Sequence, residues 1–155
     1  MGGPDEALSL DNQICFALYA ANRAVTARYR PLLDDLDLTY PQYLTMLVLW
    51  ERESSGGATR VSDLGRRLRL DSGTLTPLLK RLADRGLLER RRSRVDERVV
   101  ILTLTEAGRT LRKKARSIPE RLLCEVGVEP ERLQALREEL KALLTVLEGK
   151  TGPND

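Results

Sequence analysis

Histidine is absent from this 155-residue chain, and aromatic residues are scarce, with one Phe, one Trp and four Tyr. The chain therefore lacks the side chain that most often serves as general base or metal ligand near neutral pH. No Cys-x-x-Cys cluster or glycine-rich phosphate loop replaces it, since Gly56-Gly57 stands alone between polar residues. We therefore expect that the protein is not an enzyme and holds no cofactor or metal. Because aromatic residues are few, we expect a core built from Leu, Val and Ala, as in helices packed on helices.

Long hydrophobic runs are missing as well. No apolar stretch approaches the roughly 20 residues that span a bilayer, and residues 1–6 lack the basic and apolar parts of a secretory signal. These absences predict a cytoplasmic protein with no membrane partner. In that compartment Cys15 and Cys124 would stay reduced, so a permanent disulfide is not expected, while a reactive or redox-switching pair is possible.

Positive charge is concentrated in one part of the chain. Residues 60–98 hold 12 Lys and Arg against 6 Asp and Glu, a local charge of +6, while all other residues sum to −3. Duplex DNA carries about one charge per 1.7 Å of axis, so an arginine-rich module suits phosphate contact. An ordinary solvated surface is the alternative, and charge alone does not decide between the two.

Helical spacing of apolar residues covers most of the chain and is interrupted by one hairpin. The predicted helices span residues 8–33, 40–53, 61–68, 72–85, 106–127 and 129–147. Pro31 is expected to kink or end the first helix, and Pro77 to bend the fourth. Strands at 87–94 and 99–105 are expected to pair around the tip 95–98. This order predicts a mainly α fold with a small β-wing, a winged helix-turn-helix.

Polar residues open the second helix of the predicted pair, which Asp71 is placed to cap. In such a fold this helix lies in the major groove of double-stranded DNA and the hairpin is the wing. The expected DNA contacts are Ser72, Thr74, Thr76 and Lys80 on the helix and Arg92, Arg94 and Arg98 on the wing.

The last predicted helix carries a long leucine stripe. Its members are Leu133, Leu136, Leu140, Leu143, Leu144 and Leu147, more than a small monomer can easily bury. We therefore expect a single domain, 1–155, that forms an obligate homodimer. Residues 8–33 and 106–148 would be the dimerisation helices, and residues 39–105 the DNA-binding lobe.

Two segments in the basic region resemble the MarR family of bacterial transcription regulators, and the resemblance extends over nearly the whole chain. They are residues 70–82, LDSGTLTPLLKRL, and residues 96–108, DERVVILTLTEAG. Within that family, residues 11–19, DNQICFALY, with Tyr29 and residues 38–43, LTYPQY, resemble the organic hydroperoxide resistance regulators (OhrR). Those repressors sense peroxide through an N-terminal cysteine.

The resemblance implies roles for individual residues. Cys15 matches the sensing cysteine, and Tyr19 and Tyr29 match tyrosines that hydrogen-bond it. Arg98 matches a wing arginine that enters the minor groove, and Asp96 matches the acid that braces the wing. Cys124 resembles a second cysteine that, in some members, traps the oxidised sensor as an intersubunit disulfide; other members use a small free thiol, and a purely structural cysteine is the alternative.

Helix geometry bears on the sensing site. Cys15 and Tyr19 are four residues apart and share a helix face, while Tyr29, 14 residues from Cys15, returns to within about 40° of it but lies roughly 21 Å along the axis. An antiparallel first helix from a second subunit would bring its tyrosines to the thiol, so the site is predicted to span the dimer. Cys15 as a plain buried small hydrophobe is the alternative.

These features predict a repressor that binds a pseudo-palindromic operator and is released when an organic hydroperoxide oxidises Cys15, which derepresses a peroxide-detoxification gene. One rival is a MarR-type repressor released by a small aromatic ligand between the dimerisation helices and the reading heads, with both cysteines as spectators. The other is a thiol peroxidase, in which the basic wing would have no use.

Overall fold

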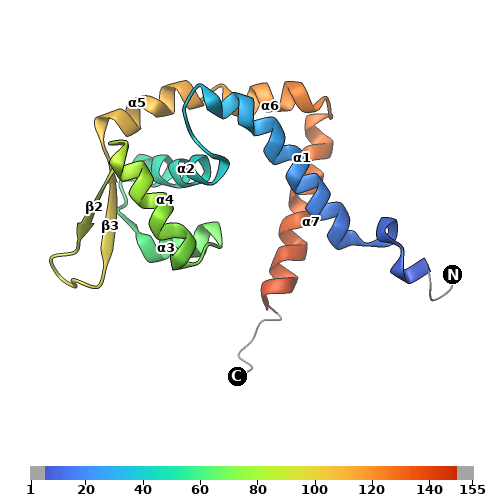
Figure 1. Cartoon of the computed structure of the whole chain (residues 1–155), viewed down its shortest axis with the longest axis horizontal. Coiled ribbons are helices and arrows are strands. Elements are labelled where there is room, and N and C mark those ends of the chain that lie inside the picture. Colours follow the sequence, from blue (N-terminus) through green and yellow to red (C-terminus); the bar gives the residue numbers. More distant parts are fainter. Residues whose placement is uncertain (1–5, 150–155) are drawn as a thin grey trace. The chain divides into compact units, whose positions relative to one another are not determined.

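The computed structural model describes residues 6–149 and divides at Ile118 and Pro119 into two compact units (Figure 1). The elements are η1 (Glu6–Leu8), η2 (Leu10–Asn12), α1 (Ile14–Asp34), α2 (Tyr40–Ser54), β1 (Thr59–Arg60), α3 (Val61–Leu68), α4 (Ser72–Asp84), β2 (Leu88–Arg92), β3 (Val100–Leu104), α5 (Glu106–Ala115), α6 (Ile118–Val126) and α7 (Pro130–Gly149). The fold is mainly helical with a small antiparallel sheet, as the sequence predicts. None of the helices within residues 6–149 is long and apolar enough to cross a membrane.

The first long helix begins later than its apolar spacing predicts. Two 3-10 turns occupy residues 6–12, and Gln13 is extended, with φ −89° and ψ 111°, so α1 starts at Ile14 and not at Leu8. Side-chain amides explain the delay: Asn12 Nδ2 donates to the Glu6 carbonyl at 2.9 Å, and Gln13 Nε2 to the Ala7 carbonyl at 2.7 Å. Such local bonds compete with helix formation.

Neither Pro31 nor Pro77 ends its helix. Pro31 lies inside α1, which continues to Asp34, and Pro77 lies inside α4, which continues to Asp84. By contrast, the single helix predicted over 106–127 is two helices, because α5 ends at Ala115 and α6 starts at Ile118. Pro119 in the first turn of α6 explains the restart, since its missing N–H costs nothing there.

The hairpin is part of a three-stranded sheet in the order β1-β3-β2. Strand β2 pairs with β3 with Arg90 opposite Leu102, and β1 pairs with the other edge of β3 with Thr59 opposite Leu102. The sequence prediction missed β1 because two residues are too short to show an alternating pattern. The sheet therefore anchors the wing to the segment that enters α3.

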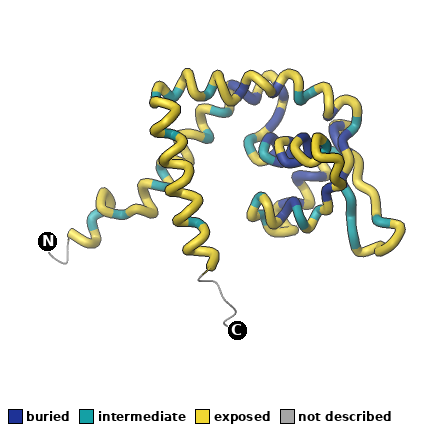
Figure 2. The backbone as a smooth tube through the Cα atoms, turned by 180° about the vertical axis from the view of Figure 1, so that it is seen from behind, coloured by how far each residue is buried: buried dark blue, intermediate teal, exposed yellow. Residues whose placement is uncertain are grey.

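The core of the first unit lies between α2, α3, α4 and the sheet. Its most deeply buried large side chains include Met46, Leu64, Leu75, Leu79, Leu82 and Leu88. In Figure 2 the buried stretches gather in this lobe, while most of α1 and all of α7 are exposed or intermediate. Helix α2 begins with a capping box, in which Thr39 Oγ1 accepts from the Gln42 amide and the Gln42 side chain accepts from the Thr39 amide. This packed lobe supports α4 and the hairpin of β2 and β3.

Candidate DNA-binding surface and redox site

Helix α4 is the second helix of the predicted helix-turn-helix pair, the one expected in the major groove, and is called the reading helix below. It presents a polar face at its start. Asp71 caps it as predicted, since Asp71 Oδ1 accepts a hydrogen bond from the Thr74 amide at 2.8 Å. That backbone N–H favours the ionised carboxylate and lowers the pKa of Asp71 below its ordinary value. The four predicted contact residues of this helix are exposed, namely Ser72, Thr74, Thr76 and Lys80. Leucines on the opposite face fix the helix to the core.

The wing tip is braced by its own backbone and side chains. Ser93 Oγ accepts from the amides of Val95 and Asp96 at 3.2 and 3.4 Å, and Asp96 Oδ1 accepts from the Arg98 amide at 3.0 Å. Asp96 therefore holds the turn by binding the backbone of Arg98. Arg98 itself is exposed.

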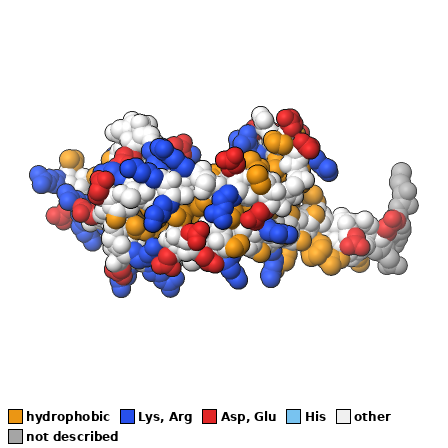
Figure 3. All heavy atoms as spheres, turned by 90° about the horizontal axis from the view of Figure 1, so that it is seen from above, with side chains coloured by type: hydrophobic (Ala, Val, Ile, Leu, Met, Phe, Trp, Pro, Cys, Tyr) orange, Lys and Arg blue, Asp and Glu red, His pale blue; other side chains and the backbone are white. Residues whose placement is uncertain are grey.

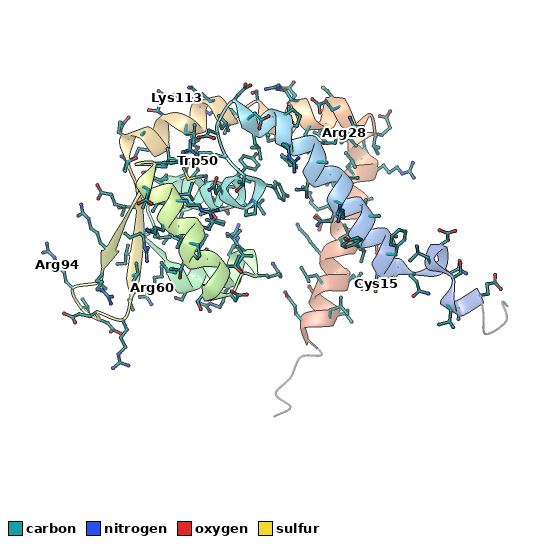
Figure 4. All side chains as sticks on the ribbon, in the orientation of Figure 1. Cys15, Arg28, Trp50, Arg60, Arg94 and Lys113 are labelled. Carbon is teal, nitrogen blue, oxygen red and sulfur yellow. The ribbon has the colours of Figure 1, made fainter. Side chains whose placement is uncertain are left out.

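Arg92 and Arg94 differ in their surroundings, although the sequence treats them alike. Arg92 Nη1 donates to the Glu97 carbonyl at 2.9 Å, so its guanidinium closes the base of the tip. Arg94 extends from the tip itself (Figure 4). In the space-filling view, Lys and Arg side chains lie among Asp and Glu at the end that carries the wing (Figure 3). Arg92 therefore braces the wing tip, a role that its position in the sequence does not reveal.

Cys15 is exposed in the first turn of α1 (Figure 4). One turn further along, the Tyr19 hydroxyl accepts a hydrogen bond from Arg23 Nη1 at 2.9 Å, and the Arg23 guanidinium carbon lies 5.5 Å from the Tyr19 ring centroid. As an acceptor in that bond, the hydroxyl keeps its own proton for donation elsewhere. A thiol at this place is open to small oxidants.

Tyr29 belongs to a cluster of three tyrosines with Tyr40 and Tyr43. Its ring centroid lies 4.7 Å from that of Tyr40 and 5.8 Å from that of Tyr43. Burial raises the pKa of Tyr29 to about 12, with a further contribution from its two neighbours, and burial likewise raises the pKa of Tyr40 and of Tyr43. Sequence spacing did not predict a role for Tyr40 and Tyr43, although both lie in the segment LTYPQY.

The sensing residues are not all brought together within one chain. Cys15 and Tyr29 lie on one unbroken helix, 14 residues apart, which places them about 21 Å apart along its axis. Cys124 is exposed on α6, in the second unit. Any contact between Cys15 and the tyrosine cluster therefore needs a second subunit.

A groove runs between α1, the linker 35–39, the start of α2 and the end of α4. Its volume is about 1010 Å³. Its polar and charged lining includes Arg23, Arg30, Tyr40, Gln42, Arg81 and Arg85, together with Asp34, Asp37 and Asp84. The groove is open to small molecules of mixed polarity.

Residues 27–115 match the family described as "Transcriptional regulator SarA/Rot". The organic hydroperoxide resistance transcriptional regulator of Bacillus subtilis (strain 168) is 48% identical over 141 residues, 91% of each chain. Among solved structures, reduced AbfR bound to DNA superposes with a TM-score of 0.74 at 32% identity, over 94% of this chain and 99% of that one. Disulfide-formed AbfR superposes with a TM-score of 0.60 at 33% identity, over 90% of this chain and 96% of that one.

These relatives are transcription regulators, not enzymes, and their similarity spans both the DNA-binding lobe and the cysteine-bearing helix. The chain belongs to the winged-helix transcription regulators of the MarR family, in the branch of the organic hydroperoxide resistance regulators.

Proposed function

We propose that this regulator is a homodimeric repressor that binds operator DNA while Cys15 is reduced and releases it when an organic hydroperoxide oxidises that thiol. The observation that carries the proposal is the position of Cys15, exposed at the start of the long helix α1, which near its far end contributes Tyr29 to the tyrosine cluster. The similarity to a hydroperoxide resistance regulator supports it, and so does the existence of a disulfide form of AbfR.

The chemistry at Cys15 balances with the peroxide alone as oxidant. The thiolate attacks the outer oxygen of ROOH, the O–O bond breaks, and the leaving alkoxide takes a proton to give ROH. Sulfur is oxidised by two electrons to the sulfenic acid as the peroxide is reduced to an alcohol. Condensation with a second thiol then forms an S–S bond and releases water.

The tyrosine cluster suits stabilisation of the reactive anion. A thiol of ordinary pKa near 8.5 is only a few per cent thiolate at neutral pH, so a sensor needs donors around the sulfur. Tyr29, with a pKa of about 12, stays protonated and can donate without adding negative charge. In a dimer with antiparallel first helices, the cluster of one subunit would face Cys15 of the other.

Dimer formation is also favoured by the exposed apolar side chains. Ile14, at the start of α1, is 66% exposed, and Leu136 and Leu147 on α7 are 53% and 56% exposed. In Figure 3 the start of α1 shows hydrophobic side chains on its surface. Residues 8–33 and 106–148 remain our proposed dimerisation helices, with residues 39–105 as the DNA-binding lobe.

DNA contact is proposed for the exposed polar face of α4 and for the wing. The residues are Ser72, Thr74, Thr76, Lys80, Arg92, Arg94, Asp96 and Arg98, with Arg92 and Asp96 acting through the shape of the wing tip. Two such lobes in a dimer would read a pseudo-palindromic operator.

The test measures operator affinity by mobility shift before and after one equivalent of cumene hydroperoxide. Wild type should lose affinity by at least tenfold, and Cys15→Ser should bind equally well with and without the peroxide. Cys124→Ser is the control for loss of a thiol as such, and in the presence of a small thiol it should still respond. Release of Cys15→Ser by the peroxide would overturn the proposal.

The groove between α1, α2 and α4 favours a second candidate, a repressor released by a small aromatic ligand. An aromatic acid added after both thiols are blocked would then release DNA. Wild-type protein that ignores peroxide but responds to such a ligand would make this the better assignment. Steady-state peroxide consumption with a thiol reductant would identify the remaining rival, a thiol peroxidase.

A further inference from the structure

Arg85 ties the end of α1 to the end of the reading helix. It is the C-cap residue of α4, and its guanidinium reaches back across 48 and 49 positions of sequence to the linker that follows α1. Nη1 donates to the Asp37 carbonyl, and Nη2 donates to the Leu36 carbonyl at 3.1 Å. Nη2 also lies 3.5 Å from Asp37 Oδ2, and the Arg85 side chain is only 31% exposed.

The linker residue that Arg85 holds is in an uncommon conformation. Asp37 has φ 49°, in the left-handed region, which is unfavourable for a residue with a side chain. Two backbone hydrogen bonds close the turn. The Asp37 amide donates to the Asp34 carbonyl at 3.0 Å, and the Leu38 amide donates to the Leu33 carbonyl at 3.2 Å. These two bonds do not use the carbonyls of Leu36 and Asp37, and the Arg85 guanidinium donates to both of them. The guanidinium thus offsets part of the cost of the turn.

Arg85 is also close to the origin of the wing. Gly86, the next residue, has φ 69° and ends α4, and its carbonyl accepts a hydrogen bond from Thr105 Oγ1 at 2.5 Å. The Leu87 carbonyl accepts from the Thr105 amide at 3.2 Å, at the end of β3. A displacement of the linker would therefore reach both the reading helix and the base of the wing through one side chain.

We infer that Arg85 is a positioning residue that couples the orientation of α1 to that of the reading helix, and thereby sets how strongly the state of Cys15 changes operator affinity. The inference rests on the proposed function, since it assumes that α1 shifts when Cys15 is oxidised. Helix α1 is unbroken from Ile14 to Asp34, so a movement at the thiol end is carried to the linker by the helix itself. Arginine suits this place because its planar fork binds two carbonyls and a carboxylate at once.

The experiment compares the ratio of operator dissociation constants for the oxidised and reduced protein. The variants are Arg85→Gln and Arg85→Lys, the second of which keeps the charge and most of the stem but loses the fork. The matched control is Arg109→Gln, which breaks a comparable contact, Arg109 Nε to Glu53 Oε1 at 2.5 Å, that does not involve α1 or its linker. Thermal unfolding of each reduced variant is measured in parallel.

The coupling ratio should fall by about tenfold in Arg85→Gln, by less in Arg85→Lys, and stay at the wild-type value in Arg109→Gln. A purely structural role would lower the unfolding temperature and weaken DNA binding in both redox states alike. An unchanged ratio in a folded Arg85→Lys and Arg85→Gln, with a responsive wild type, overturns this inference alone. A wild type that ignores peroxide overturns the proposed function instead.

Discussion

Trp50 Nε1 donates a buried hydrogen bond of 2.9 Å to the carbonyl of Gly108, 58 residues later in the chain. The bond fastens α5 to α2, and Trp50 is 4% exposed (Figure 4). Position 108 is a glycine because the backbone of α5 comes close there to the Leu87 carbonyl, in the loop that enters β2. The aromatic ring packs in the core, and its indole N–H has a hydrogen-bond partner, as buried indoles usually do.

Gly108→Ala should destabilise the fold strongly. A Cβ on residue 108 would lie 2.2 Å from the Leu87 carbonyl oxygen and 3.1 Å from Leu104 Cδ2, and a backbone neighbour cannot move aside as a flexible side chain can. We expect a loss of about 2–4 kcal/mol in the free energy of unfolding, measured by urea denaturation. Gly57→Ala, whose nearest neighbour would be the Arg52 carbonyl at 3.8 Å, is the control and should change stability by less than about 0.5 kcal/mol. Equal effects would mean that α5 does not approach Leu87 so closely.

Tyr29→Phe should change how stability depends on alkaline pH. The pKa of Tyr29 is about 12 in the fold and about 10 in an unfolded chain, because burial favours the neutral phenol. Its contribution is complete below pH 10 and is lost as the pH rises from 10 to 12, since in that range the unfolded state gives up the proton first. Between pH 9 and pH 11 wild type should lose about 1 kcal/mol more than Tyr29→Phe. Tyr19→Phe, which removes an exposed hydroxyl outside the cluster, should keep the wild-type profile, and coinciding profiles for all three would contradict the assignment.

Arg92→Gln and Arg94→Gln should weaken operator binding in different ways. Loss of a phosphate contact lowers the slope of log K against log salt by about one, whereas loss of a bracing contact does not. Because Arg92 binds the Glu97 carbonyl, we expect weaker binding with an unchanged salt slope for Arg92→Gln and a reduced slope for Arg94→Gln. Titrations at four salt concentrations decide the point. A reduced slope in Arg92→Gln would make it a phosphate ligand after all.

Local signals in the sequence predict the fold well. The cap at Asp71 and the order of helix pair and hairpin are confirmed, because caps and periodicity depend on neighbouring residues. The two-residue strand β1 was missed, since its pairing with β3 crosses about 40 residues of chain and leaves no pattern.

The candidate site was harder to predict for the same reason. The tyrosine cluster, the brace at Arg92 and the contact of Arg85 with the linker each depend on which side chains the fold brings together. Sequence spacing did predict that Cys15 and Tyr29 cannot meet on one straight helix, and α1 is unbroken between them. The residue roles carried over from the family resemblance stay predictions until variants are measured.

Leu140→Glu on α7 should break the proposed dimer. Leu140 is 39% exposed and lines a small apolar groove of α7 with Leu133, Leu136 and Leu144, so a carboxylate there would be buried without a partner in an apolar interface. We expect the dimer dissociation constant to rise by roughly 100-fold or more, measured by sedimentation equilibrium. Gln134→Glu adds the same charge on another face of α7 and should leave the dimer intact. A dimeric Leu140→Glu would place the interface elsewhere.

Cys124→Ser tests how the oxidised sensor is trapped. Disulfide formation requires two Cα atoms within about 7 Å of each other, and Cys124 is exposed, so it is free to meet a sulfenic acid brought to it by dimer formation or by helix movement. In wild type, hydroperoxide should give a covalent dimer on a non-reducing gel that disappears with a reductant. Cys124→Ser should give none, and its release from DNA should then require an added small thiol, because the sulfenic acid has no protein partner. A covalent dimer that survives in Cys124→Ser but is absent from Cys15→Ser would show that Cys15 pairs with its counterpart in the other subunit, and Cys124 would lose its proposed role.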